Sequence, residues 1–407
     1  MAFFRRSKKT EQNNSPEPAQ ERKPVLPTPP QSDESGRRSL SDQRQYLLSL
    51  VDPLPAFGMY LLDAWGMPIC EDIYANADLQ QSSVADVDGY AISSTLAVPG
   101  ARIRGTYVTA GQELPDGTDA VILHGDSNGI VDIEEPVDAG RNVRGAGAGL
   151  KKGDLLVKSG TVLNARLSGL LAGAGFDRVL ARPRPRVVVL DVVDPSATSI
   201  SERAVNEVNS HLIAAALKAD GAQVWRVDIP AGTDEQLSDM ISDQLIRADL
   251  IVSAAGLATS QMIEVVDSMG LVDVANVAIT PGGKVAFGLI GEDAIPMFML
   301  PSNPTDAFIT YLTLVRPVVS KLMGLSSFTL DHEEVPAASR LESPAGLTQF
   351  LTAQIRDGKA VPLASAESGM LLDIANCDGL ICLPDHVIDV NEGDPVQFIT
   401  LAEQRIK

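Results

Sequence analysis

The apolar residues of this chain follow a different pattern in each region. Between residues 186 and 324, continuous apolar runs such as RVVVLDVV and DLIVSAAG alternate with stretches of helical periodicity. A continuous apolar run is typical of a parallel strand that is covered on both faces. The alternation predicts a doubly wound α/β domain, with Asn209 as a helix N-cap, Gly221 as a helix stop and a long closing helix from Pro304.

The flanking regions carry other patterns. Residues 84–143 hold short β-prone runs between Gly, Pro and Asp turns, and 325–407 are β-prone again, with a hairpin over RDGK. Before residue 84, Ser39 or Ser41 can cap a helix that Pro53 ends, and we expect a second helix within 56–76 and then a short strand. The predicted domains are a tail (1–38), a helical connecting domain (39–83 and 144–185), an all-β domain (84–143), the α/β ligand domain (186–324) and a C-terminal β-barrel (325–407).

The N-terminal tail differs in composition and charge. Residues 1–38 are rich in Pro, Ser, Gln, Glu and Lys, which predicts disorder because too little apolar area can be buried. They hold eight basic and five acidic residues, so the tail is +3 and the rest of this −20 chain is −23. Such an acidic body repels nucleic acid, although acidity alone commonly means solubility. Phe3 and Phe4, beside basic residues, could touch a membrane surface, or the basic start is simply solvated.

Cysteine and histidine content excludes several classes. The three cysteines form no metal-spaced pair and the four histidines lie far apart, so a zinc site is not expected. An odd cysteine number in a long chain fits a reducing cytoplasm. We find neither an apolar run of membrane-spanning length nor a signal peptide, and expect a cytoplasmic protein.

Four stretches carry a resemblance to a known family. They are SSVADVDGYAIS, VTAGQELPDGTDAVI, FMLPSNPTDAF and NCDGLICLP, in that order along the chain. Together they resemble the molybdopterin molybdenumtransferases, the family of MoeA and of the E-domain of gephyrin, over about residues 39–401. With its Pro-rich tail, the chain is most similar to actinobacterial gephyrin-like proteins associated with the division protein FtsZ.

The resemblance implies an elongated, L-shaped homodimer with the four domains above. It also implies transfer of molybdate to the dithiolene of adenylylated molybdopterin with Mg²⁺. By resemblance, Asp88 and Asp194 are the candidate catalytic acids and Asp88 the candidate metal ligand. From the residues alone, Asp88 could equally be a turn residue ahead of Gly89.

Several family positions are altered here. By resemblance, the candidate ligand-binding residues are Gly256, Ser260, Glu264, Lys284 and Asn303. Glu264 and Lys284 stand one position from the family's acid and cation, and one position turns a helical side chain by about 100°. Thr280 and Thr352 replace an expected Lys and Arg, and each lost charge-assisted bond costs about 1.5–3 kcal/mol. These changes predict an eroded catalytic site.

Two functional hypotheses follow. The first is a scaffold with no required cofactor and little or no catalysis, which binds the C-terminal tail of FtsZ at the septum. By resemblance to gephyrin, its peptide-binding residues are Asp42, Tyr46, Leu383, Pro384 and Asp385; Tyr46 could instead belong to the core. The N-terminal tail is then a candidate site for a membrane-associated partner. The alternative is a working molybdenumtransferase that uses Mg²⁺ and molybdopterin.

Overall fold

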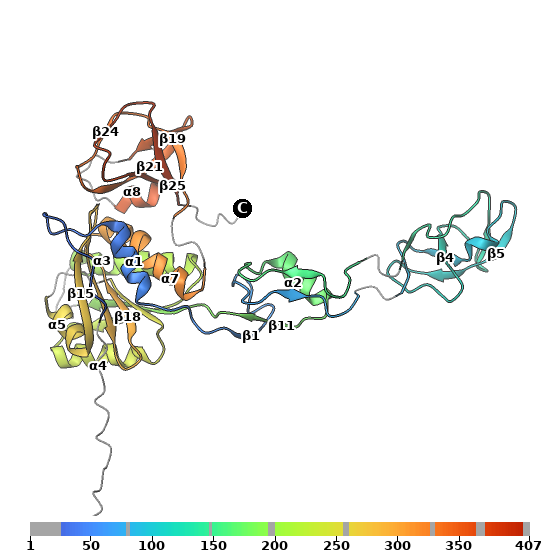
Figure 1. The fold of residues 1–407 in the computed structure, drawn as a ribbon, viewed down its shortest axis with the longest axis horizontal. Helices are drawn as coiled ribbons and strands as arrows, with labels where there is room; N and C mark the ends of the chain where they lie inside the picture. The colour runs from blue at the N-terminus through green and yellow to red at the C-terminus, as the bar shows by residue number, and fades with distance from the viewer. Residues whose placement is uncertain are drawn as a thin grey trace, which may run out of the picture.

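The computed structural model describes residues 26–78, 82–145, 149–193, 200–254, 260–325, 330–363 and 371–401, with side chains omitted at Val193, 200–206 and Ser260. The molecule is L-shaped (Figure 1). The α/β domain lies at the corner with the C-terminal domain beside it. A long arm runs from the corner through the connecting domain to the all-β domain at the far tip.

A six-stranded sheet forms the centre of the α/β domain, in the order β13-β12-β14-β18-β17-β15. Its first four strands pair in parallel. Strand β17 pairs antiparallel with both of its neighbours, β18 and β15. Their bounds are Arg186–Val193 (β12), Gln223–Pro230 (β13), Leu250–Ser253 (β14), Gly270–Asn276 (β15), Lys284–Ile290 (β17) and Ile295–Met299 (β18). This confirms the predicted α/β fold.

Helices cover both faces of this sheet. They are α3 (Ile200–Ala219), α4 (Asp234–Leu245), α5 (Ser260–Met269), α6 (Pro304–Thr310) and α7 (Arg316–Leu322), with a π-helical turn over Tyr311–Val315. Val187 and Val189 of β12 pack in the core with α3 and α7, whereas Val188 and Leu190 pack with α4 and α5. Burial on both faces explains the continuous apolar run.

Asn209 is not the predicted N-cap, because α3 begins nine residues earlier at Ile200. Its buried side-chain amide instead donates to the carbonyl of Ser302 at 2.7 Å. The helix does end before Gly221, whose φ of 95° favours glycine.

The C-terminal domain is built on the sheet β16-β21-β23-β25-β19, with β22 on β21. The bounds are Ile279–Thr280 (β16), Glu333–Pro336 (β19), Leu341–Glu342 (β20), Thr348–Arg356 (β21), Lys359–Pro362 (β22), Leu371–Asn376 (α8), Gly379–Leu383 (β23), Asp389–Val390 (β24) and Pro395–Thr400 (β25). The predicted hairpin is confirmed, with Asp357 and Gly358 at positive φ in its turn. Since β16 comes from the α/β segment, the two domains share hydrogen bonds.

The connecting domain differs from the prediction in two ways. Helix α1 (Leu40–Ser49), capped by Ser39, packs on α7 of the α/β domain and not in the arm. The predicted second helix is wrong: Phe57–Tyr60 is strand β1, paired with β11 (Arg178–Ala181), and Gly66 at φ 78° disfavours a helix. The predicted strand ending at Tyr74 exists as β2 (Ile73–Tyr74), which pairs with β10 (Leu155–Val157) near α2 (Ala165–Gly173).

The all-β domain has the predicted short strands: Val84–Ala85 (β3), Gly89–Ile92 (β4), Arg102–Arg104 (β5), Thr106–Val108 (β6), Ala120–Ile122 (β7), Ile130–Asp132 (β8) and Val143–Arg144 (β9), with a 3₁₀ turn at Ser94–Leu96. Strand β4 lies between β6 and β7. A Cβ on Gly89 would stand 2.5 Å from the carbonyl oxygen of Ile122, so this position requires glycine.

The prediction of a disordered tail does not hold for residues 26–38. Arg38 forms a β-bridge with Val277 and a two-bond ion pair with Asp273, at 2.6 and 2.9 Å. Tyr46 donates to the carbonyl of Pro27 at 3.3 Å. Residues 1–25 lie outside the described residues. No helix in the described part of the chain is both long and apolar enough to cross a bilayer.

Candidate functional site

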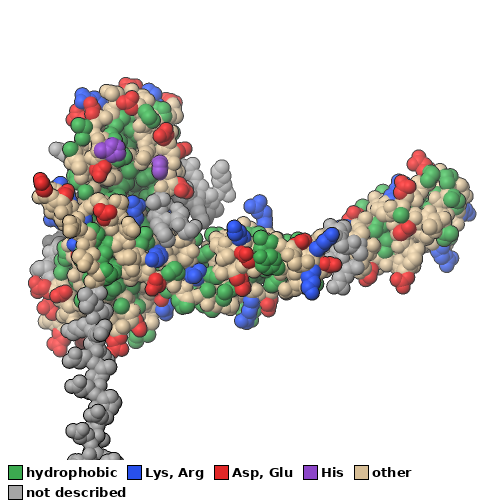
Figure 2. Space-filling view, in the orientation of Figure 1, with side chains coloured by type: hydrophobic (Ala, Val, Ile, Leu, Met, Phe, Trp, Pro, Cys, Tyr) green, Lys and Arg blue, Asp and Glu red, His purple; other side chains and the backbone are tan. Residues whose placement is uncertain are grey.

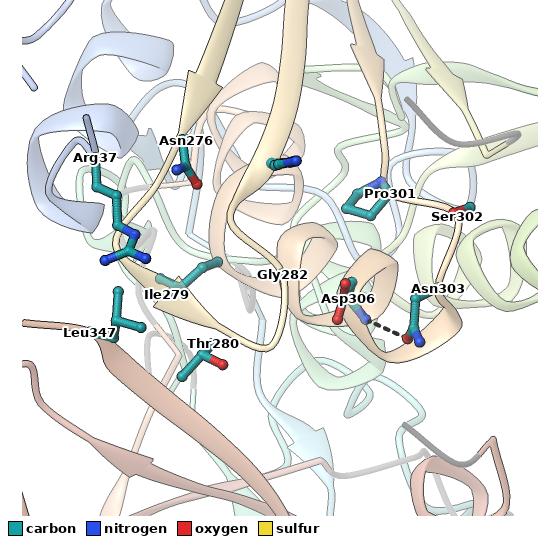
Figure 3. Close-up of a pocket in the computed structure, with 11 residues that line it drawn as sticks. Arg37, Asn276, Ile279, Thr280, Gly282, Pro301, Ser302, Asn303, Asp306 and Leu347 are labelled. Atoms are coloured by element: carbon teal, nitrogen blue, oxygen red, sulfur yellow. Dashed lines mark hydrogen bonds between the residues drawn. The ribbon is translucent and has the colours of Figure 1, made fainter. Parts of the chain in front are cut away.

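A cavity of about 630 Å³ opens where the α/β domain meets residue 37 and the C-terminal domain. Figure 3 shows residues from separate elements around it. Its lining consists of Arg37, Asn276, Ile279, Thr280, Gly282, Lys284, Pro301, Ser302, Asn303, Asp306 and Leu347. The volume falls within the range of roughly 300–1,000 Å³ typical of small-molecule sites.

Two loops of the α/β domain shape this cavity. Lys284 is the first residue of β17, directly after Gly282 and Gly283, whose φ values of 99° and 101° favour glycine. Asn303 is the N-cap of α6, and its side-chain oxygen accepts the N–H groups of Thr305 and Asp306 at 2.9 and 3.3 Å. The NP turn therefore fixes Asn303 beside the cavity and begins the helix.

The charges around the cavity favour an anionic ligand. Among the described residues, neither Arg37 nor Lys284 has a carboxylate partner within 4.0 Å. Asp306 is the one acid in the lining. Burial raises its pKa above the ordinary value, although a hydrogen bond from the Gly282 backbone opposes this. Two cations with hydroxyl and amide groups nearby can hold a phosphate-type or other oxyanion.

The predicted catalytic acid Asp88 does not reach this cavity within one chain. Asp88 is exposed in the all-β domain at the far tip of the arm, where its carboxylate accepts the N–H of Ala110 at 2.8 Å. That contact supports the turn role left open from the sequence. Asp194 lies outside the described residues.

Of the predicted ligand-binding residues, Lys284 and Asn303 line the cavity together. Glu264 is exposed on α5 and does not line it. Its side chain is exposed to solvent, so its predicted ligand-binding role stays a prediction apart from this cavity. Gly256 lies outside the described residues, and Ser260 is described only as the backbone start of α5.

The predicted peptide-binding residues differ in how far they are buried. Tyr46 is 7% exposed and Leu383 is 2% exposed, so both are core residues, and Tyr46 takes the alternative role left open from the sequence. A peptide cannot contact them without unpacking α1 or β23. Asp42 and Asp385 are exposed and Pro384 is partly exposed.

Sequence reasoning missed Arg37, Asp306 and Asp191. Arg37 lies in the segment predicted to be disordered, although the helix cap at Ser39 is an available sign of order. Asp306 stands in the first turn after the NP cap. Asp191 is 2% exposed in β12 and accepts from Ser210 at 2.9 Å; its burial raises its pKa.

The described residues offer no evident metal centre. Among them, no group of three or more His, Cys, Asp or Glu side chains is arranged to hold a metal ion. The three cysteines are unpaired, and burial raises the pKa of Cys377 and of Cys382 to about 11.

The fold and the cavity define a class: an elongated multidomain protein with an anion-type cavity in an α/β domain. Comparison with known proteins specifies it further. Residues 38–175 match the MoeA N-terminal region (domain I and II), and residues 334–401 match the MoeA C-terminal region (domain IV). The chain belongs to the molybdopterin molybdenumtransferase, or MoeA, family, as the sequence resemblance predicts.

Individual relatives support this assignment. Molybdopterin molybdenumtransferase 1 of Mycobacterium tuberculosis H37Rv is 32% identical over 315 residues, covering 73% of this chain and 74% of the relative. Molybdopterin molybdenumtransferase 2 of that organism is 23% identical over 401 residues, with 88% and 98% covered. A crystal structure of a molybdopterin biosynthesis MoeA protein from Pyrococcus horikosii matches with a TM-score of 0.70 at 23% identity, covering 90% of this chain and all of that one. That likeness confirms the fold.

Proposed function

We propose that this chain is a molybdenumtransferase of molybdenum cofactor biosynthesis, whose α/β cavity holds the anionic part of a molybdopterin ligand. The observation that carries the proposal is the cavity itself, which is lined by Lys284 and Asn303, two of the ligand-binding candidates from the resemblance. The names of the relatives support the same activity. This was the alternative hypothesis from sequence, and we now prefer it to the scaffold.

The cavity residues have distinct roles in this proposal. Lys284 supplies a positive charge toward the anion, and Ser302 and Thr280 offer hydroxyl donors. Asn303 caps α6 beside the cavity: its side-chain oxygen satisfies the N–H groups of Thr305 and Asp306, which fixes the position of this turn.

Mg²⁺ does not fit the described residues of a single chain. A magnesium ion needs several oxygen ligands, and Asp306 is the one carboxylate in the cavity lining. Asp88 lies in another domain, and the described residues contain no group of three candidate ligands. We therefore assign no step to the metal.

A homodimer belongs to the same proposal. Large apolar side chains of the connecting domain are about half exposed or more: Phe57 (51%), Tyr60 (51%), Leu62 (84%), Trp65 (51%) and Tyr74 (49%). Figure 2 shows hydrophobic side chains over this arm. Exposed apolar side chains of this size on one domain favour an interface, and a second copy is the partner we propose. Sedimentation of the Leu62→Ser/Trp65→Ser double variant should show a monomer if these residues pair, and an unchanged dimer would reject that surface.

Genetic complementation tests the activity. A strain that lacks molybdenum insertion should regain molybdoenzyme activity with this chain, and Asp88→Ala should abolish the rescue. Arg104→Ala, in the same all-β domain, is the matched control and should rescue fully. Failure of the folded wild-type protein to rescue would contradict the proposal.

A scaffold that binds the C-terminal peptide of FtsZ at the septum remains the second candidate. Among the described residues, no group of three or more candidate ligands is arranged to hold a metal ion, and this favours the scaffold. The exposed Asp42, Pro384 and Asp385 would carry the contacts, with residues 1–25 available to a membrane-associated partner. Calorimetry with the peptide should show binding that Asp42→Ala weakens, and no binding at high micromolar concentration would reject this candidate.

A further inference from the structure

Arg37 and Lys284 are two cations without carboxylate partners that line the same cavity. The side chain of Arg37 has one hydrogen bond among the described residues, to the hydroxyl of Ser35 at 3.5 Å, which is long for such a bond. The chain as a whole has 53 acidic and 33 basic residues, so acids are in excess. The Arg37 charge acts on the nearby Asp33 carboxylate but forms no ion pair with it. Two cations that lack an ion-pair partner among the described residues of such a chain are suited to an external anion.

The backbone around Arg37 is held in place by its neighbours. Asp33 accepts the N–H of Arg37 at 2.9 Å and donates its own N–H to the Arg37 carbonyl at 2.8 Å. On the other side, Arg38 bonds to the backbone of Asn276 and Ala278, and its guanidinium is buried against Asp273. These contacts position Arg37 and use none of its guanidinium donors.

The two cations come from different parts of the chain. Lys284 lies in the α/β domain, whereas Arg37 lies in the segment before α1 and outside the matched family region. Thr280, which lines the same cavity, carries no charge. Figure 3 shows Arg37 on the side of the cavity where Thr280 and Leu347 lie.

We propose that Arg37 is a ligand-binding residue of this cavity, which together with Lys284 holds a tetrahedral oxyanion of phosphate or molybdate type. The guanidinium presents a planar fork of donors that can bind two oxygens at once, and Lys284 adds a point charge. The inference rests on the proposed function for the identity of the ligand, but the anion site itself can be measured without turnover.

Calorimetry of the full chain with molybdate alone and with inorganic pyrophosphate alone tests this assignment. Arg37→Ala and Lys284→Ala should each weaken binding by about 10- to 100-fold, as expected for one charge-assisted bond. Arg37→Lys should recover part of the affinity because the charge returns without the fork. Arg104→Ala, an exposed cation of the all-β domain, should leave the affinity unchanged. The anion that binds more tightly shows whether the site prefers a molybdate-type or a phosphate-type ligand.

Two results would overturn the assignment: a wild-type chain that binds neither anion, or an Arg37→Ala variant with unchanged affinity and an unchanged melting temperature. The complementation assay separates this inference from the proposed function. Lost anion binding in Arg37→Ala with no rescue by wild type supports the site and rejects the activity. Full rescue by Arg37→Ala with unchanged anion affinity supports the activity and rejects the role of Arg37 in the site.

Discussion

The turn that carries Asp88, directly before β4, lies at the far tip of the arm, whereas the cavity that carries Lys284 lies near the corner of the L, where the α/β domain meets the C-terminal domain (Figure 1). The first presents an exposed carboxylate on a small all-β domain. The second presents two cations at the junction of two domains. A ligand with both anionic groups and a bound cation needs both kinds of side chain. One chain cannot bring them together, so either a second copy supplies the acid or Asp88 is only a turn residue.

Mixing two inactive variants distinguishes these possibilities and has the largest expected effect. Asp88→Ala and Lys284→Ala should each lose activity by orders of magnitude if both residues act on the ligand. When equal amounts are unfolded, mixed and refolded, half of the dimers are mixed and each contains one intact site. The expected recovery is about a quarter of wild-type activity, because an isologous dimer has two equivalent sites.

The controls for mixing are the two variants refolded separately, which should stay inactive. If the mixture stays inactive while sedimentation shows dimers, then Asp88 does not complete the site of a partner. Its contact with the Ala110 N–H would then account for its presence.

The second prediction compares ion pairs in the two regions. Arg38 and Asp273, beside the cavity, have side chains only 12% and 7% exposed, whereas Arg102 and Asp132 in the all-β domain are each 69% exposed. Arg38→Ala leaves a buried carboxylate unpaired and should lower the free energy of unfolding by about 3–5 kcal/mol. Arg102→Ala should change it by less than about 1 kcal/mol. Urea denaturation measures both, and equal losses would contradict this account of burial.

The same comparison shows what the sequence could predict. The β12 run RVVVLDVV predicts a two-sided parallel strand because burial on both faces is local information. The β1 segment was expected to be helical because its pairing with β11, over a hundred residues away, leaves no local sign. Likewise, Lys284 and Asn303 could be found from the turns that hold them. Arg37 is harder to find: the cap at Ser39 is the local sign of order, but the contacts that hold the neighbouring Arg38 come from the distant residues Asp273 and Asn276.

The third prediction concerns the glycine next to Asp88. Gly89→Ala would place a methyl group 2.5 Å from the Ile122 carbonyl oxygen and 2.9 Å from a methyl of Val121. Strand β4 would have to separate from β7, at a cost of about 1–3 kcal/mol for an overpacked buried site. Gly100→Ala is no clean control because of its positive φ, but Gly145→Ala meets nothing within 4 Å and should be nearly neutral. If the Gly89→Ala protein were as stable as wild type, then β4 and β7 would accommodate the added methyl group at no measurable cost in stability.

The smallest effect is expected at Asp306. This acid is partly buried in the cavity lining, whereas Asp88 is exposed in its turn. Burial raises its pKa above 3.8, so the folded chain holds this proton more tightly than the unfolded chain. Stability from this group is therefore present at low pH and is lost as the pH rises through the raised pKa. At neutral pH the ionised carboxylate is a penalty of less than about 1 kcal/mol, because partial exposure screens it.

Asp306→Asn should remove that penalty while its side-chain oxygen still accepts the Gly282 N–H. The gain in stability should be greatest near neutral pH and should disappear as the pH falls below the ordinary aspartate pKa, when followed by denaturation between about pH 3 and pH 7. Molybdate or pyrophosphate should also bind more tightly to this variant at neutral pH, since one negative charge leaves the lining shared with Arg37 and Lys284. A gain that grows toward acid pH would mean that the fold stabilises the ionised Asp306 carboxylate, and weaker anion binding would mean that its charge does not repel the ligand; either result would contradict this account.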